Sequence, residues 1–275
     1  MHEALPMLAK AIAAPAAISL AVALLLCRFA NEPWRRYAAA IAFATGFCAA
    51  FGIIRPWGEL LPSRHWQWTF YIALAAAVLG PISAAPRLHW VERLLLLAFS
   101  AVVASWLLVP TWESLQPPRA VWLTLLASYF VLIAAAMEPL ASFLPARHLF
   151  AWLTVSAGAT AVLVTAAISL TYGQLAGASA AALLGCSLAV WRSAKADNLR
   201  ALVPAYAAIV GGWAFVGCID PPQSIWGLLL APAAPLALWC FARGPLAKLT
   251  GFGAIAAQAG AVAAILGIAA WLALA

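Results

Sequence analysis

Charged residues are scarce in this chain of 275 residues, since Asp, Glu, Lys and Arg make up 8% of it, against about 25% in soluble domains. A water-soluble protein with so little charge lacks the polar groups to cover its surface. The hydrophobic fraction is 67%, and it is arranged in long runs that match the roughly 20 residues of a membrane-crossing helix. The runs lack the period-two alternation of a transmembrane barrel. The sequence therefore predicts an all-α integral membrane protein.

Metal and cofactor motifs are also missing. The five cysteines form no CxxC pair, and most lie in apolar runs, where cysteine behaves as a small hydrophobe. The four histidines lie in expected loops or at the ends of expected helices. We find no HExxH motif, no phosphate-binding glycine loop and no nucleophile elbow. We therefore predict no metal, no cofactor and no catalytic residue. The net charge of +7 is spread over the loops, so nucleic acid is not an expected partner.

Apolar runs separated by Pro, Gly and Asp predict ten membrane spans in one domain over residues 1–275. A tight turn is expected at Tyr172-Gly173-Gln174, because residues 149–191 are too many for one helix. Small residues such as Gly253 and Gly260 predict close helix packing. Two halves of five spans, 1–142 and 143–275, would be inverted repeats of the kind found in many transporters. The expected spans are 10–28, 37–54, 67–84, 93–110, 120–138, 149–171, 174–191, 202–219, 225–241 and 250–274.

Basic residues alternate between the loops and predict the orientation. Eleven of the fifteen Lys and Arg fall on one side, and Lys10, Arg55, Arg64 and Arg119 fall on the other. The positive-inside rule places the eleven in the cytoplasm, so both the N-terminus and the C-terminus are expected outside. Most tryptophans fall near the ends of expected spans, as in interfacial belts. The richness in alanine suggests a bacterial protein of the cytoplasmic (inner) membrane, with the lipid bilayer as its main partner.

Two outer loops form the first candidate site, a binding site for an anionic headgroup or carboxylate. Arginine offers such groups a bidentate fork of donors, and tryptophans would flank an amphipathic ligand. The alternative is an ordinary aromatic belt whose arginines are neutralised by acidic neighbours. The candidate residues are Arg55, Glu59, Arg64, His65 and Trp66 in the longer loop, and Glu113 and Arg119 in the shorter one.

The ninth span contains the second candidate site, a transport hinge at Pro232 and Pro235. Each proline removes a backbone donor and disturbs the preceding turn, and broken helices form substrate sites in many transporters. Gly211 and Gly212 in the eighth span are expected to leave space for a ligand beside them. The alternative is a kinked packing helix, which membranes tolerate.

Ionisable residues are missing from the centres of the expected spans, which disfavours an ion-coupled pump. Glu138 comes nearest, at the inner end of the fifth span. It predicts a carboxylate at the inner mouth that binds a proton or cation. The alternative is an interfacial carboxylate that pairs with Arg147 or reaches water.

Three classes of function remain. We expect a multi-pass inner-membrane protein that is transporter-like for a small neutral or lipid-like molecule, and not an enzyme. The alternative is a non-catalytic structural or accessory subunit with other membrane proteins as partners. The third is an enzyme acting on a lipid-linked substrate, which requires Glu59, His65, Glu113 and Arg119 to gather in one pocket.

Overall fold

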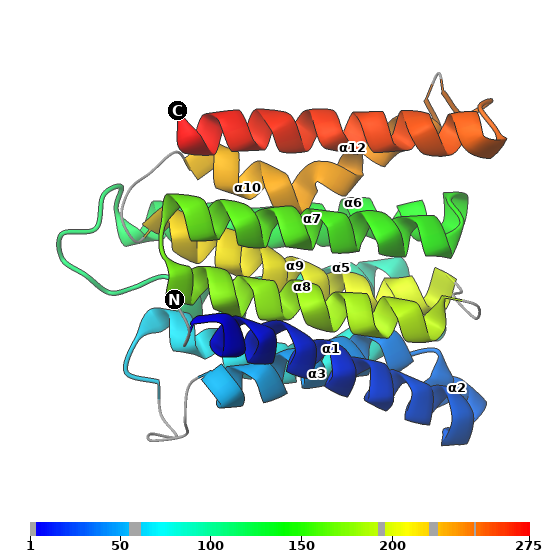
Figure 1. The fold of residues 1–275 in the computed structure, drawn as a ribbon, viewed down its shortest axis with the longest axis horizontal. Helices are drawn as coiled ribbons and strands as arrows, with labels where there is room; N and C mark the ends of the chain where they lie inside the picture. The colour runs from blue at the N-terminus through cyan, green and yellow to red at the C-terminus, as the bar shows by residue number, and fades with distance from the viewer. Residues whose placement is uncertain (1–3, 55–61, 192–195, 220–224, 245) are drawn as a thin grey trace.

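The structure is a computed structural model that describes residues 4–54, 62–191, 196–219, 225–244 and 246–275. These residues form helices and connecting loops, with no β-strand among them. The helices lie side by side along one axis, as Figure 1 shows. Seven of them are long and apolar enough to cross a membrane. The expected all-α fold is confirmed, and its composition is that of a helical membrane protein.

The seven long helices differ from the remaining ones in their length relative to the thickness of a membrane. The 17 residues of α3 and the 16 of α4, at about 1.5 Å per residue, are shorter than a hydrocarbon layer of roughly 30 Å. The count of ten spans therefore remains a prediction. The long helices are α1 (Ala4–Phe29), α5 (Trp90–Leu108), α6 (Arg119–Phe143), α7 (Ala146–Ala167), α8 (Leu170–Val190), α9 (Ala196–Ile219) and α12 (Gly251–Leu274). The short ones are α2 (Glu32–Arg35), α3 (Ala38–Ile54), η1 (His65–Gln67), α4 (Trp68–Ser83), α10 (Ile225–Ala233), η2 (Ala234–Leu238) and α11 (Trp239–Ala242).

Helix α9 is the centre of the bundle. It packs against α3, α4, α5, α6, α7, α8 and α10, and every residue from Ile209 to Ile219 is buried. A helix that is apolar on all sides is expected in such a position. Helix α4, the third span of the first half, packs mainly against α3, α5 and α9. Its counterpart in the second half is α9, which has the central position, so the two halves pack differently at their third span. The division of the chain into halves at residue 142 stays a prediction.

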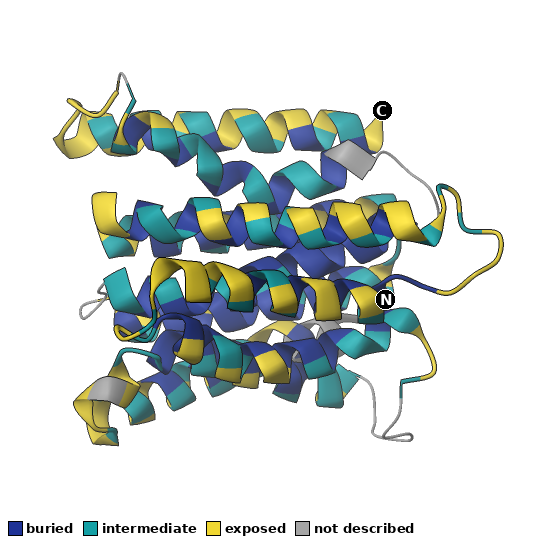
Figure 2. Ribbon diagram, turned by 180° about the vertical axis from the view of Figure 1, so that it is seen from behind, coloured by how far each residue is buried: buried dark blue, intermediate teal, exposed yellow. Residues whose placement is uncertain are grey.

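Glycine allows close helix contacts at positions other than those the sequence suggested. A side chain at Gly185 of α8 would collide with the backbone of Ala16 in α1, and one at Gly80 of α4 would collide with the carbonyl of Ala201 in α9. Gly253 and Gly260 instead face open space, on the exposed side of α12 at the edge of the bundle (Figure 2). Close helix packing at glycine is therefore present between α1 and α8 and between α4 and α9, but not at Gly253 and Gly260 of α12.

The turn between α7 and α8 lies earlier than predicted. It occupies Ile168 and Ser169, and Tyr172-Gly173-Gln174 belongs to α8. The Ser169 hydroxyl accepts a hydrogen bond from the Tyr172 amide at 3.3 Å, which caps the new helix. A serine cap inside an apolar run is enough to separate the sixth and seventh predicted spans.

Both ends of the chain lie at the same end of the bundle as the loop between α5 and α6 (Figure 1). The short helix α2 and the connection from α11 to α12 lie at the opposite end. We call the end of the bundle with the two termini the outer end and the opposite one the inner end, after the orientation that the basic residues predict.

Candidate functional site

A polar pocket opens at the outer end of α4, α5 and α6. This outer pocket has a volume of about 570 Å³, within the roughly 300–1,000 Å³ of typical ligand sites. It brings together residues from the two loops that the sequence singled out. The lining residues used below are Arg64, His65, Trp66, Trp106, Trp112 and Arg119.

The remaining candidates of these loops are placed differently. Glu113 is exposed in the loop between α5 and α6 and does not line the outer pocket. Arg55 and Glu59 lie outside the described residues. The described wall of the pocket therefore carries Arg64 and Arg119 and no carboxylate, a combination that attracts an anion.

Arg119, the first residue of α6, is held against Trp106. Its Cζ atom lies 4.3 Å from the centroid of the indole ring, within the range of a cation–π contact. Its Nη2 donates to the Trp106 carbonyl at 3.1 Å. Its Nε is buried and has no hydrogen-bond partner among the described residues. A guanidinium has five N–H donors, and the bond to Trp106 uses one of them, so the terminal N–H groups keep capacity for an anionic ligand.

Local hydrogen bonds shape the loop that carries Arg64. The Gln67 Oε1 atom accepts from the backbone amides of Ser63 at 2.7 Å and Arg64 at 3.0 Å. On the other side, the ring of His65 meets Trp112 edge-on, with centroids 5.2 Å apart. This contact ties the two outer loops together and fixes the width of the pocket.

Tryptophans at the outer end do more than form a lipid-facing belt. Trp66 and Trp122 are only 1% and 2% exposed. The ring of Trp66 lies 6.0 Å from Tyr172, and Tyr172 lies 6.1 Å from Trp213 in the middle of α9. Trp66 and Tyr172 of the pocket wall therefore belong to an aromatic cluster that reaches α9, of which the sequence marked only Trp66 as a site residue.

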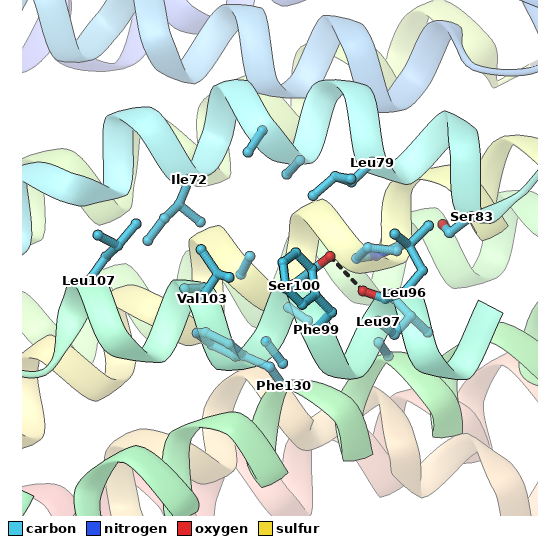
Figure 3. A pocket seen from close by; sticks show the side chains of 18 of the residues that line it. Ile72, Leu79, Ser83, Leu96, Leu97, Phe99, Ser100, Val103, Leu107 and Phe130 are labelled. Carbon is cyan, nitrogen blue, oxygen red and sulfur yellow. Dashed lines mark hydrogen bonds between the residues drawn. The ribbon is translucent and has the colours of Figure 1, made fainter. Parts of the chain in front are cut away.

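An apolar groove lies next to the outer pocket and runs along the bundle. It lies between α4 and α5, with Phe130 of α6 and Pro204 of α9 behind it. Leu107 lines both the groove and the outer pocket. Figure 3 shows Ile72 and Leu79 facing Val103 and Phe99 across the groove.

The hydroxyl of Ser100 is one of the few polar groups in the groove. It donates to the Leu96 carbonyl at 2.7 Å, as drawn in Figure 3. Because that hydroxyl is already bonded within α5, the groove presents a hydrocarbon surface. The groove has a volume of about 150 Å³, so it takes part of a hydrocarbon chain, and an amphiphile with a polar head matches the pocket and groove together.

The ninth predicted span is broken where its prolines stand. Helix α10 ends at Ala233 and is followed by η2 and α11. Two hydroxyls from neighbouring helices bind carbonyls of this segment: Tyr129 donates to Leu229 at 2.8 Å, and Tyr206 donates to Pro232 at 2.9 Å. These carbonyls have partners within the protein, as lipid-embedded backbone requires. Pro235 is buried in η2.

Side chains fill the space beside the two glycines of α9. A Cβ atom at Gly211 would lie 3.0 Å from the Tyr129 ring, and one at Gly212 would lie 3.4 Å from Leu108. The ligand space expected beside Gly211 and Gly212 is thus occupied by packed side chains. A hinge role for Gly211, Gly212, Pro232 and Pro235 stays a prediction.

Glu138 has a different partner from the expected one. Its Oε1 lies 3.2 Å from Nη1 of Arg93, and Nη2 of the same arginine donates to the Ala85 carbonyl at 3.0 Å. The alternative interpretation, an interfacial carboxylate that pairs with Arg147 or reaches water, thus named the wrong partner, because Arg93 of α5 lies at ion-pair distance from Glu138. The ion pair joins α5 to α6 near the inner end, and proton or cation binding at Glu138 stays a prediction.

No protein-family model, no curated protein and no solved structure matches this chain. The function is therefore argued from the chain's own residues.

Proposed function

We propose that this chain is a multi-pass membrane protein that binds a membrane lipid with an anionic phosphodiester headgroup. The phosphate lies in the outer pocket near Arg64 and Arg119, and one hydrocarbon chain lies in the groove between α4 and α5. The observation that carries the proposal is that Leu107 lines both the cationic pocket and the apolar groove. Lipid binding of this kind is a step shared by lipid transport and lipid-dependent assembly.

The proposal includes ten spans with both termini outside, in a bacterial inner membrane. The spans comprise the seven long helices together with α3, α4 and the segment from α10 to α11. The distribution of basic residues supports this orientation, and it sets the outer pocket at the level of the outer headgroups. In a variant without Cys27 and Cys240, an impermeant maleimide is expected to label Gln116→Cys in whole cells but not Ala196→Cys. The reverse labelling pattern would invert the topology.

The headgroup provides the selectivity, because the hydrocarbon chain gains little by moving from bilayer to groove. Lipid tails are as apolar as the leucines they would meet. Charge-assisted hydrogen bonds from guanidinium to phosphate are the stronger contribution, at about 1.5–3 kcal/mol each. The two arginines and the carboxylate-free wall described above therefore favour an anionic over a zwitterionic headgroup.

Native mass spectrometry of the detergent-purified protein tests the headgroup. We expect phosphatidylglycerol to be retained in preference to phosphatidylcholine. Arg119→Gln should weaken phosphatidylglycerol binding about tenfold, since one lost charge-assisted bond at the low end of that range, about 1.5 kcal/mol, corresponds to that factor. Arg147→Gln is the matched control, because Arg147 is exposed at the start of α7. Equal retention of the two lipids, or equal effects of the two substitutions, would refute the proposal.

A second pair of variants tests the groove. Ala104→Phe places a ring in the groove, whereas Ala263→Phe places it on the exposed face of α12. We expect only the first to reduce phosphatidylglycerol retention. Ser100→Leu, at a half-buried groove position, serves if Ala104→Phe fails to fold. If a folded groove variant retains phosphatidylglycerol as well as the wild-type protein does, the hydrocarbon chain does not lie in the groove.

A further inference from the structure

A second hollow adjoins the outer pocket on the far side of Trp112 and Tyr172. These two aromatic residues line both spaces, so the hollow and the pocket share a wall. Its volume is about 640 Å³, again within the usual range for ligand sites. We call it the neutral hollow, because its described lining contains no charged residue. The lining residues that matter here are Trp112, Ser114, Gln116, Trp122, Ser169 and Tyr172.

The chemistry of the neutral hollow differs from that of the outer pocket. It combines aromatic faces with hydroxyl and amide groups, whereas Arg64 and Arg119 line the outer pocket. Ser114 and Gln116 are exposed in the loop between α5 and α6, and each side chain both donates and accepts hydrogen bonds. Aromatic faces receive C–H groups, and the polar groups receive hydroxyls. A neutral ring with several hydroxyls presents both kinds of group.

Trp122 adds a separate observation. It is 2% exposed, packs edge-on against Phe215 with centroids 5.4 Å apart, and lines the neutral hollow. Its indole Nε1 has no hydrogen-bond partner in the described part of the chain. A buried donor without an acceptor costs free energy. Because Nε1 is closed to solvent, a ligand hydroxyl bonds it only after the wall of the hollow shifts, and the bond then offsets that cost.

We infer that the headgroup of the bound lipid carries a hydroxyl-rich ring, a hexose or a cyclitol, attached to its phosphate, and that this ring occupies the neutral hollow. The inference rests on the proposed function, since the phosphate must first be held near Arg119. The charged pocket then binds the phosphate and the hollow beside it binds the ring. A site built to hydrogen-bond hydroxyl groups discriminates strongly against ligands that lack them.

Two lipids of equal charge test the inference. Phosphatidylinositol and phosphatidylglycerol both carry one phosphodiester, and they differ in the alcohol attached to it. In a competition followed by native mass spectrometry, we expect wild-type protein to prefer phosphatidylinositol about fivefold or more. One additional hydrogen bond of about 1 kcal/mol gives that factor.

Variants separate the hollow from the pocket. Trp122→Phe and Gln116→Ala should bring the preference close to one while leaving phosphatidylglycerol binding at the wild-type level. Gln116 is exposed in a loop, so its variant keeps the test valid if Trp122→Phe fails to fold. Arg119→Gln should weaken both lipids and leave their ratio unchanged. Absence of a preference in wild-type protein that binds phosphatidylglycerol overturns this inference alone. Failure to bind either lipid overturns the proposed function as well.

Discussion

The broken segment from α10 to α11, midway along the length of the bundle, and the pocket at its outer end differ in how their polar groups are used. In the middle, the carbonyls of Leu229 and Pro232 accept hydrogen bonds from Tyr129 and Tyr206. At the outer end, the Nε of Arg119 has no partner among the described residues. Both regions contain residues that are unusual for a membrane helix. The presence of proline or arginine therefore does not by itself indicate a ligand site. A polar group whose hydrogen bonds are made within the protein is structural, and one that keeps free donors has capacity for a ligand.

The surrounding solvent explains this difference. Hydrocarbon offers no hydrogen bonds, so a backbone group released by proline in the bilayer must find a partner in the protein. At the headgroup level, water, ions and lipid phosphates supply partners. An arginine there can remain incompletely paired in the protein without a large loss of stability.

Substitution of Gly211 in α9, where side chains fill the space beside the helix, has the largest expected effect. Gly211→Leu forces a side chain against the rings of Tyr129 and Phe130, and overpacking of this kind destabilises by about 1–3 kcal/mol. We expect a clear fall in the thermal unfolding temperature of the detergent-solubilised protein. Gly253→Leu is the control, because no atom lies within 4 Å of the added Cβ. If both variants unfold alike, α9 has free space beside Gly211 and the transport hinge regains support.

Removal of one tyrosine hydroxyl has a smaller expected effect. Tyr206→Phe leaves the Pro232 carbonyl without its 2.9 Å bond. Hydrogen bonds between membrane helices contribute about 0.6 kcal/mol on average and up to about 1.7. We expect a loss of about 1 kcal/mol in reversible unfolding by denaturing detergent. Tyr37→Phe is the control, since the described contacts include no side-chain hydrogen bond of Tyr37. Equal losses would mean that the bond to Pro232 contributes nothing specific.

At the outer end, stability and binding should separate. Arg119→Gln removes one hydrogen bond and one cation–π contact with Trp106, the latter worth about 0.5–1 kcal/mol at an exposed site. Because water replaces the exposed hydrogen bond, we expect an unfolding loss of about 1 kcal/mol, similar to that of Tyr206→Phe, together with the tenfold loss of phosphatidylglycerol binding. Parallel unfolding and lipid titrations check this. A large loss of stability would make Arg119 a structural residue and weaken the contrast between the regions.

Sequence reasoning predicted local features better than tertiary ones. Apolar runs predicted the helical segments, and Pro232 predicted a break, because both effects act within one segment. The turn at Ser169 was misplaced because a single capping serine gives a weaker signal than Tyr172-Gly173-Gln174. The partner of Glu138 was wrong because Arg93 is 45 positions away and only helix packing brings it near.

The outer pocket was predicted in part for the same reason. Arg64, His65, Trp66 and Arg119 were found because they flank loops rich in charge and tryptophan. Trp122 was assigned to an interfacial belt and Tyr172 to a turn. Their burial beside the pocket depends on how α6 and α8 pack, which spacing along the chain does not encode.

Glu113 gives the smallest expected effect and the finest distinction at the outer end. It is exposed and does not line the outer pocket, so water and salt screen its charge. Glu113→Gln should therefore strengthen phosphatidylglycerol binding by less than about twofold, corresponding to about 0.4 kcal/mol or less. Titrations at low and at physiological salt measure the effect, which should shrink as salt rises. An increase comparable to the tenfold loss in Arg119→Gln would show that Glu113 neutralises Arg119 directly. The outer end would then be closed on itself by an ion pair, as the middle is by its hydrogen bonds.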